Sequence, residues 1–436
     1  MNFTTDYRLE NFILQTQWAD IPAPVQERLR GCMLGALVAG SGSGQFAAGL
    51  ALARRAFRSG DIAVIGAADT FDFLGASAAM GHASNAYDID DGHNIIRAHP
   101  GTSFIGGLLA AGYECDLNAQ DFLAALYVSY ETTIRMGEAI MDYYQYAHSS
   151  GTFGAVGVAA GAGRIYGLDR AALNNILSIA EFNAPLVPGI RSVEYPSMNK
   201  DGVPFGVMIG ALALLADQCG FTGNKHLLEA DEYRRYLDDL GQNHEVMALY
   251  FKPYPCCRWG HPAIDACLAL MAEHHVTAQD IKSVTVETFY KATQLSKGIP
   301  SCADAAQYNI AYPVAAAIVN NGFSIQQVEN TNDDAVIDMM GRLSFVCDPE
   351  LDAQFPARRL CRAAMVLKDG RRIVSDVHEP RGEACENIGY DWLADKFHRI
   401  TAHRLTSPQQ EVFIQRLHND DWTVRQLISQ VNAALL

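Results

Sequence analysis

A change of hydrophobic periodicity after residue 276 constrains the fold of this chain more than any other feature. Before it, apolar residues recur at three-to-four spacing with short breaks, as in residues 120–142 and 207–216, which is typical of packed helices. Residues 281–289 instead alternate apolar and polar side chains and are rich in β-branched residues, which predicts a half-buried strand. The pattern therefore predicts a mainly α protein that contains a smaller α/β part.

Short segments of both kinds follow this first strand. They are strands predicted at residues 343–347, 363–367 and 372–377, and helices at residues 304–320 and 333–342. The Asp369-Gly370 pair between the last two strands predicts a hairpin. Helical texture returns after residue 388 in segments without a core of their own, which should pack on the earlier helices. We therefore expect a discontinuous all-helical domain, residues 1–273 and 388–436, with an inserted smaller α/β domain, residues 276–387.

Two glycine-rich segments resemble nucleotide-binding loops. Residues 40–44 and 161–163 carry closely spaced glycines, but no strand leads into either of them, and no Lys-Ser/Thr follows the first. The first is better interpreted as a joint between helices. The second lies in the Gly/Ala-rich run of residues 151–167, which predicts a helix packed closely against its neighbours.

The charge balance limits the possible partners. The 436 residues carry a formal net charge of −16, which argues against nucleic acid or an anionic membrane surface as a partner. The apolar runs are broken before they reach a membrane-spanning length, and the N-terminal residues lack an apolar signal core. We expect a cytoplasmic protein with ten reduced cysteines. An anionic ligand would need a local basic island.

The densest group of titratable side chains follows a small-residue helix predicted at residues 70–87. It contains three carboxylates, two imidazoles and a guanidinium, from Asp88, Asp90, Asp91, His93, Arg97 and His99. Because histidine titrates near neutral pH and a carboxylate can orient it, such a group can move protons. A loop that only turns the chain is the simpler alternative. A metal site ranks lower, because metal-ligand spacings do not accompany the aspartates.

Other candidates precede helices or lie in rigid loops. His148 stands at the start of the Gly/Ala-rich helix, where a helix N-terminus favours a ligand carboxylate. Ser197 and Lys200 match the Ser-x-x-Lys pattern of acyl enzymes, but the companion motifs are missing from the sequence, so Lys200 is better interpreted as a cation facing an anion. Tyr308 and Tyr312 lie four residues apart on one predicted helix and should share a face.

A loop held by two prolines carries the remaining cations. Lys252, Arg258 and His261 project from it, and Cys256-Cys257 lies between them. The two thiols and the imidazole could form a metal site, but adjacent cysteines ligate one ion poorly. Buried thiols that only pack are the preferred interpretation.

Taken together, these motifs resemble those of the MmgE/PrpD family. The order is Asp88-Ile89-Asp90-Asp91 with His99-Pro100, then His148, the Lys200 turn, the Lys252–His261 loop and Gln307-Tyr308-Asn309-Ile310-Ala311-Tyr312. The resemblance implies a large helical domain, an α/β lid, a homodimer, and a site without cofactor or metal for di- or tricarboxylates. Enzymes of this family dehydrate 2-methylcitrate, decarboxylate cis-aconitate or epimerise iminodisuccinate, and all of them form or quench a carbanion beside a carboxylate.

The resemblance also implies roles for individual residues. The expected catalytic residues are Asp88, His99, His148, Lys200 and Tyr312, and the expected substrate-binding residues are Asp91, His93, Arg97, Lys252, Arg258 and His261. Either His99 or His148 would transfer the proton, and Asp88 or Asp91 would fix its tautomer. The lysines and Arg258 would stabilise enolate charge, and closure of the lid would exclude water.

The sequence departs from the family pattern at Gly92, where several members have Thr or Ser, and at Val203, where many have His. These departures leave the substrate open. We expect a hydro-lyase acting on a small di- or tricarboxylate. The alternatives are an epimerase of a substituted succinate, whose branch fits the spacing from Asp88 to His99, then a decarboxylase, then a non-catalytic carboxylate-binding relative, and last a Ser-x-x-Lys hydrolase.

Overall fold

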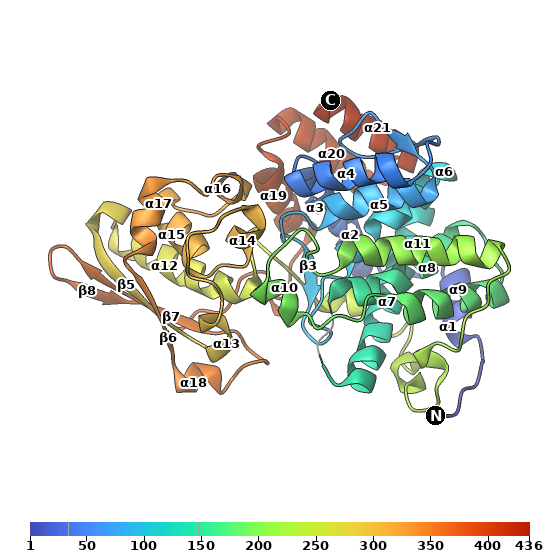
Figure 1. Cartoon of the computed structure of the whole chain (residues 1–436), viewed down its shortest axis with the longest axis horizontal. Helices are drawn as coiled ribbons and strands as arrows, with labels where there is room; N and C mark the ends of the chain where they lie inside the picture. The colour runs from blue at the N-terminus through green and yellow to red at the C-terminus, as the bar shows by residue number, and fades with distance from the viewer. Residues whose placement is uncertain (34, 147–148) are drawn as a thin grey trace.

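Three long helices form the centre of the larger, helical part of the molecule. In this computed structural model, which describes residues 1–33, 35–146 and 149–436, α7 (Ala119–Tyr144), α8 (Ser150–Ile165) and α11 (Val203–Gln218) pack on one another, with α8 in the middle (Figure 1). An ideal Cβ on Gly206 would lie 2.2 Å from the carbonyl oxygen of Gly151, so α8 and α11 cross in backbone contact. The prediction of a closely packed Gly/Ala helix is confirmed.

Further helices surround this centre. They are α1 (Arg8–Gln15), α2 (Ala23–Cys32), α3 (Ala36–Gly40), α4 (Gly44–Ala56), α5 (Phe73–Ser84), α6 (Ile105–Glu114), α9 (Arg170–Asn183) and α10 (Ile190–Glu194). The C-terminal helices α19 (Tyr390–Thr401), α20 (Ser407–Asn419) and α21 (Val424–Leu435) pack against α2, α3 and α6. In Figure 1 the C-terminus therefore lies beside the N-terminal helices α4 and α5.

The region predicted as all helical also contains short strands. β1 (Ile62–Ala63) pairs with β2 (Thr70–Phe71), and β3 (Asp91–His93) pairs with β4 (Leu249–Phe251), both antiparallel. Strands of two or three residues are too short for alternation to reveal them. The second pair matters for function, because it joins the Asp88–His99 segment to the start of the Lys252 loop.

A four-stranded sheet in the order β6-β5-β7-β8 forms the smaller part of the molecule. The strands are β5 (Ile281–Thr288), β6 (Leu343–Cys347), β7 (Cys361–Leu367) and β8 (Arg372–Val374). β5 is parallel to β6 and antiparallel to β7, and the predicted β7–β8 hairpin is present. Three helices accompany the sheet: α12 (His261–His274) packs on β7, α15 (Ala311–Asn320) packs on α12, and α17 (Asp334–Met340) packs on α15.

The single helix predicted at residues 304–320 is wrong. α14 (Ala303–Gln307) ends before Tyr308, and α15 begins at Ala311. The side-chain Oδ1 of Asn309 accepts a hydrogen bond from the backbone N–H of Tyr312 at 2.8 Å, so Asn309 satisfies a free donor at the start of α15. Tyr308 and Tyr312 therefore do not share one helix face.

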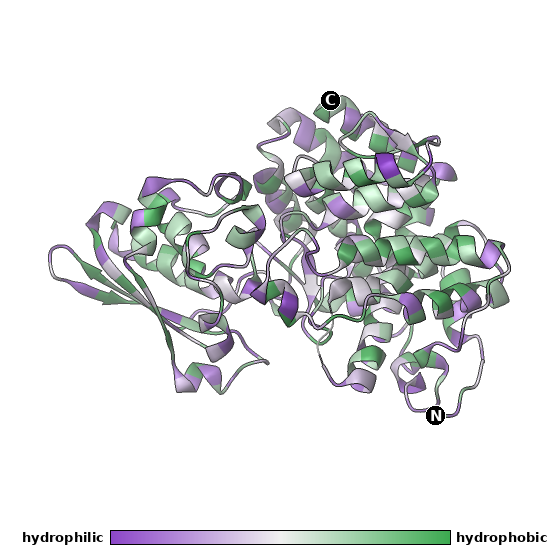
Figure 2. Ribbon diagram, in the orientation of Figure 1, coloured by the Kyte–Doolittle hydropathy of each residue, from purple (hydrophilic) through white to green (hydrophobic). Residues whose placement is uncertain are grey.

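Figure 2 shows that apolar residues cover most of α11 and much of α8, in keeping with their central position. Among the described helices, none is by itself long and apolar enough to cross a membrane. The pair Ala23–Gly40 and Gly44–Ala56 meets that test only jointly, and its two halves are bent by 82°.

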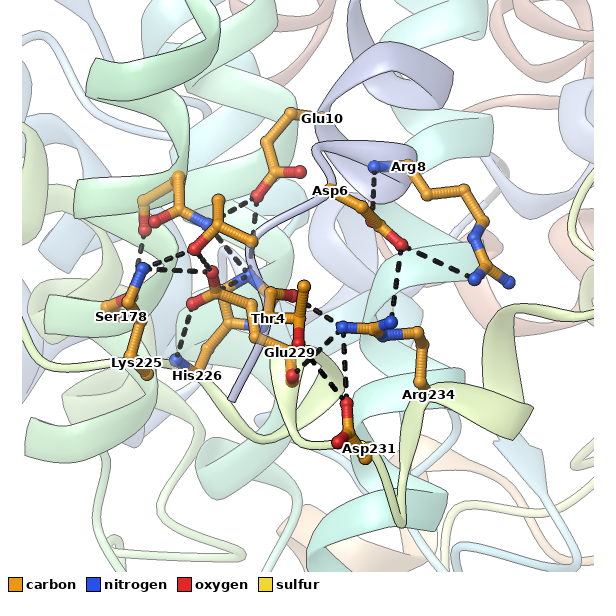
Figure 3. A network of polar contacts seen from close by, with 12 residues as sticks. Thr4, Asp6, Arg8, Glu10, Ser178, Lys225, His226, Glu229, Asp231 and Arg234 are labelled. Carbon is orange, nitrogen blue, oxygen red and sulfur yellow. Dashed lines mark hydrogen bonds and ion pairs between the residues drawn. The ribbon is translucent and has the colours of Figure 1, made fainter. Parts of the chain in front are cut away.

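A polar network ties the N-terminal segment to residues 225–234 (Figure 3). Glu10 accepts a hydrogen bond from the Asn174 amide at 2.7 Å and lies 3.3 Å from Nε2 of His226. Burial opposes the charge of Glu10, but these two partners outweigh it and lower the carboxyl pKa below its usual value. The Arg234 guanidinium donates to the carbonyl of Thr4 at 2.6 Å. These contacts fix the N-terminus on the helical part.

Candidate active site

A cavity of about 340 Å³ lies where residues of the helical part meet the segment that follows β4. Five of the eleven predicted site residues line it. The described lining residues are Asp88, Arg97, His99, Ser149, Ser150, Gly189, Ile190, Val193, Asp201, Tyr250, Lys252, Cys257, Arg258, Trp259, Lys291, Tyr308, Phe355, Pro356 and Arg359.

Asp88 and Lys252 form a buried ion pair at the wall of this cavity. Asp88 is 1% exposed and lies between α5 and β3, whereas Lys252 directly follows β4. The Lys252 ammonium donates to the Asp88 carboxylate at 2.5 Å and to the Asp88 backbone carbonyl at 3.1 Å. Burial disfavours the charge of Lys252, but the neighbouring Asp88 carboxylate outweighs burial and raises the lysine pKa. Lys252 is therefore a fixed cation.

His99 has a defined tautomer. Its Nδ1 lies 2.7 Å from the backbone carbonyl oxygen of Asp91, and because a carbonyl only accepts hydrogen bonds, Nδ1 carries the proton. Nε2 then presents a lone pair 3.3 Å from the Lys252 ammonium. Burial, followed by the charge of Lys252, lowers the pKa of His99 to about 4. The ring is therefore a neutral base near pH 7.

Asp201, at the turn before α11, is a carboxylate that the sequence analysis did not select. Its Oδ2 lies 3.8 Å from Nε2 of His99, and burial together with the charge of Asp88 raises its pKa to about 6. One donor atom each from Asp88, His99 and Asp201 lie within 4.8 Å of one another, which is a possible metal-ligand set. The Lys252 ammonium already contacts two of these three residues, so a cation of the chain itself occupies this position.

The cavity is the basic island that an acidic protein needs for an anionic ligand. Two lysines and three arginines line it, against two carboxylates: Lys252, Lys291, Arg97, Arg258 and Arg359 against Asp88 and Asp201. Ser149 and Ser150, at the start of α8, also line the cavity, although the N–H groups of Ser149 and Gly151 already donate to backbone carbonyls. The arrangement suits a small molecule with more than one carboxylate.

Three predicted substrate-binding residues, Asp91, His93 and His261, lie behind the cavity wall. Asp91 accepts hydrogen bonds from the Tyr130 hydroxyl at 2.6 Å and from the N–H of Gly101 at 3.2 Å. His93 is 1% exposed, with Nε2 3.5 Å from a Glu245 carboxylate oxygen. The side chains of Asp91 and His93 therefore support the loop, and the backbone carbonyl of Asp91 orients His99.

His261 also points away from the cavity. It is fully buried, and its Nε2 lies 3.0 Å from the backbone carbonyl of Cys256. Burial lowers the pKa of His261 and raises that of the Cys257 thiol to about 12. The geometry gives no support to a metal site made of these thiols and this imidazole, because the ring nitrogen binds the backbone.

Contrary to the sequence prediction, the Lys200 side chain does not face a ligand. Its ammonium lies 2.8 Å from the Asp304 carboxylate and donates to the Gln307 amide oxygen at 2.5 Å. It lies over the ring of Tyr308, 5.8 Å from the centroid. Lys200 therefore backs the cavity wall rather than facing a ligand. Its ammonium is bound to Asp304 and Gln307 rather than to the exposed Ser197, which removes support for the hydrolase alternative.

Among the described lining residues, Tyr308 is present and the predicted Tyr312 is not. The Tyr312 hydroxyl donates to the backbone carbonyls of Gln327 and Asn330, at 2.7 and 2.8 Å. The Tyr308 hydroxyl is buried without a hydrogen-bond partner among the described residues, and burial keeps its pKa well above the usual value. His148, the remaining predicted residue, lies outside the described residues.

Among the charged and aromatic lining residues, the sequence did not point to Asp201, Tyr250, Lys291 or Arg359, and it favoured Tyr312 over Tyr308. Asp201 had a usable signal, since it directly follows Lys200 and precedes an apolar helix. Tyr250 and Arg359 are single residues in unremarkable segments, and only the folded chain brings them to the cavity.

Two protein families match the chain. The MmgE/PrpD N-terminal domain matches residues 7–239, and the MmgE/PrpD C-terminal domain matches residues 254–420. None of the curated proteins compared with the chain matches it. The two matched ranges contain every lining residue of the cavity except Tyr250 and Lys252, which lie in the short interval between them.

Proposed function

Because the chain belongs to the MmgE/PrpD family, a dehydratase- and lyase-like family, we propose that it is a hydro-lyase that works without a cofactor on a small di- or tricarboxylate. The reaction would begin with removal of a proton from the carbon next to a carboxylate. The excess of cations around the cavity supports an anionic substrate, and the phenol, imidazole and ammonium that line it supply the groups that such a reaction needs.

The observation that carries this proposal is the state of His99. The Nδ1–H of His99 donates to the Asp91 backbone carbonyl, and the ring is neutral. The Nε2 lone pair faces the cavity beside Lys252. A base in this state can accept a carbon-bound proton at neutral pH. A fixed ammonium within 3.3 Å of that base can stabilise the negative charge that the departing proton leaves on the substrate.

Tyr308 completes the proposed dehydration. The carbon–hydrogen bond breaks as His99 takes the proton, and its electron pair forms the new carbon–carbon double bond as the β-hydroxyl leaves. Tyr308, protonated and without a hydrogen-bond partner among the described residues, donates its proton to the leaving hydroxyl, so that water is released. The imidazolium and the phenolate then return to their starting states by proton exchange with solvent.

An epimerase of a substituted succinate is the second candidate, and Asp201 favours it. Its pKa of about 6 and its place in the cavity lining make it a second proton carrier. Inversion requires that one group remove the proton and that another return it to the opposite face. Decarboxylation and ligand binding without turnover are the remaining alternatives.

Product analysis separates these candidates. The purified protein, without added metal or nucleotide, is incubated with citrate, 2-methylcitrate, cis-aconitate and substituted succinates, and proton NMR follows the products. A new vinylic proton signal from citrate, or collapse of the methyl doublet of 2-methylcitrate to a singlet, supports dehydration. Loss of optical rotation without a change of mass supports epimerisation, and release of carbon dioxide supports decarboxylation. No conversion of any compound, together with measurable binding, would contradict the enzyme proposal.

A further inference from the structure

Arg359 is a buried cation without a protein partner. It lies between α18 (Pro349–Asp352) and β7, is 8% exposed, and lines the cavity. The structure records neither a hydrogen bond nor an ion pair for its guanidinium among the described residues. Burial lowers the pKa of Arg359, the neighbouring Arg258 and Arg97 oppose its charge, and Tyr250 and Glu383 favour it. A largely buried guanidinium without a hydrogen bond or ion pair is costly, so the position favours an anion from outside the chain.

Arg258 faces the same space with part of its guanidinium unused. The residue is 4% exposed, and one terminal nitrogen, Nη2, binds the Glu383 carboxylate at 2.5 Å. Its Nε and Nη1 are buried without a hydrogen-bond partner in the described part of the chain. An arginine offers five N–H donors in a fixed fork, so Arg258 retains donors for a second carboxylate.

Tyr250 contacts both Arg258 and the proposed base. The guanidinium carbon of Arg258 lies 3.7 Å from the centroid of the Tyr250 ring, and the same ring meets His99 edge to face, with centroids 6.5 Å apart. Gly92 permits this position, because a Cβ there would lie 2.1 Å from Cζ of Tyr250. Arg258 and His99 thus both contact the Tyr250 ring.

Lys252 and the arginines of the cavity differ in how far neighbouring carboxylates neutralise their charges. Lys252 is paired with Asp88 at 2.5 Å, and it contacts the proposed base. Arg359 is unpaired, Arg258 is only partly satisfied, and the exposed Arg97 lies nearby on a third segment of the chain. The excess positive charge of the cavity is therefore concentrated on the arginines.

We propose that Arg359 and Arg258, with Arg97 at the edge, form a subsite for a second carboxylate of the substrate and so make the protein selective for dianions over monoanions. This inference deepens the proposed function and rests on it for the identity of the reacting end. Arg359 acts here as a specificity-determining residue that does not contact the reacting carbon. Bidentate binding of a carboxylate by arginine explains the preference for guanidinium over ammonium at this position.

The test compares the affinity of the full-length protein for two four-carbon acids, succinate and butyrate, by isothermal titration calorimetry. The variants are Arg359→Met, Arg359→Lys and Arg358→Met. Arg358 is the matched control, because it is the adjacent arginine, its side chain is 54% exposed, and it pairs with Glu379 at 2.8 Å. We expect Arg359→Met to weaken succinate binding ~10- to 100-fold, as for loss of a charged hydrogen bond, and to leave butyrate binding within about twofold. Arg359→Lys should recover part of the loss, because it restores charge without the fork.

Binding and turnover separate failure of this subsite from failure of the proposed function. Equal loss of succinate and butyrate affinity in Arg359→Met, or equal succinate affinity in Arg359→Met and Arg358→Met, would overturn the subsite even if the protein is a lyase. Selective loss of succinate affinity supports the subsite even if no compound turns over. Far-ultraviolet circular dichroism checks that each variant is folded, and an unfolded Arg359→Met leaves the decision to Arg359→Lys.

Discussion

Removing the charge of Lys252 should raise the pKa of His99. Two unit charges 3.3 Å apart interact by ~5 kcal/mol at an effective dielectric constant of about 20, and one unit of pKa corresponds to ~1.4 kcal/mol. The Asp88 carboxylate, 3.8 Å from Nε2, then remains unpaired and favours the imidazolium. We expect Lys252→Met to raise the His99 pKa from about 4 to 6.5 or above.

The assay is NMR of protein labelled with ¹³C- and ¹⁵N-histidine, titrated from pH 4 to 8. His99 is identified by the signals that His99→Gln removes. In the wild-type protein the Nδ1–H tautomer should persist until the pH falls to about 4, so a rate that depends on the neutral base should also fall only there. Lys291→Met is the control, because Lys291 also lines the cavity but does not contact His99. A His99 pKa that stays near 4 in Lys252→Met would refute the reasoning and leave burial as the sole cause.

Three further predictions concern single residues and assembly. Tyr308→Phe should lower kcat ~100- to 10,000-fold, as for loss of a general acid. Tyr312→Phe should keep kcat and lower only the unfolding midpoint, because the Tyr312 hydroxyl donates to backbone carbonyls. Equal kcat values in both variants would contradict this assignment. Gly92→Ala should displace Tyr250, since the added Cβ would lie 2.1 Å from Cζ, and weaken succinate binding ~10-fold, whereas Gly44→Ala, where a Cβ meets nothing within 4 Å, should bind succinate normally. We also expect a homodimer, so sedimentation equilibrium should give twice the mass of the chain, and a monomer at micromolar concentration would disprove it.

Local patterns predicted most of the fold. β6 has the predicted bounds, and β5, β7, β8, α7 and α11 differ from prediction only at their ends, because period and hairpin signals are properties of neighbouring residues. The break between α14 and α15 at Asn309 was not predicted, because it depends on one contact, the hydrogen bond from the backbone N–H of Tyr312 to the Asn309 side chain. That single contact decides which tyrosine lines the cavity.

The site was predicted in part. Asp88, Arg97, His99, Lys252 and Arg258 do line one cavity, because motifs rich in charged groups are visible in sequence. The ligand-facing position predicted for Lys200 was wrong, because its partners Asp304 and Gln307 lie more than a hundred residues away in the sequence. Arg359 was missed for a related reason. Its significance comes from an absent partner, which no sequence pattern reports.

The central claim is that His99 takes a proton from the carbon beside a carboxylate. Its most direct measurement is deuterium incorporation in D₂O, followed by proton NMR on the panel compound that reacts or exchanges fastest, with wild-type, His99→Gln and Arg358→Met proteins. The account predicts exchange in the wild type and in Arg358→Met, and a rate ~100- to 10,000-fold lower in His99→Gln. Exchange at the wild-type rate in a folded His99→Gln protein would contradict it.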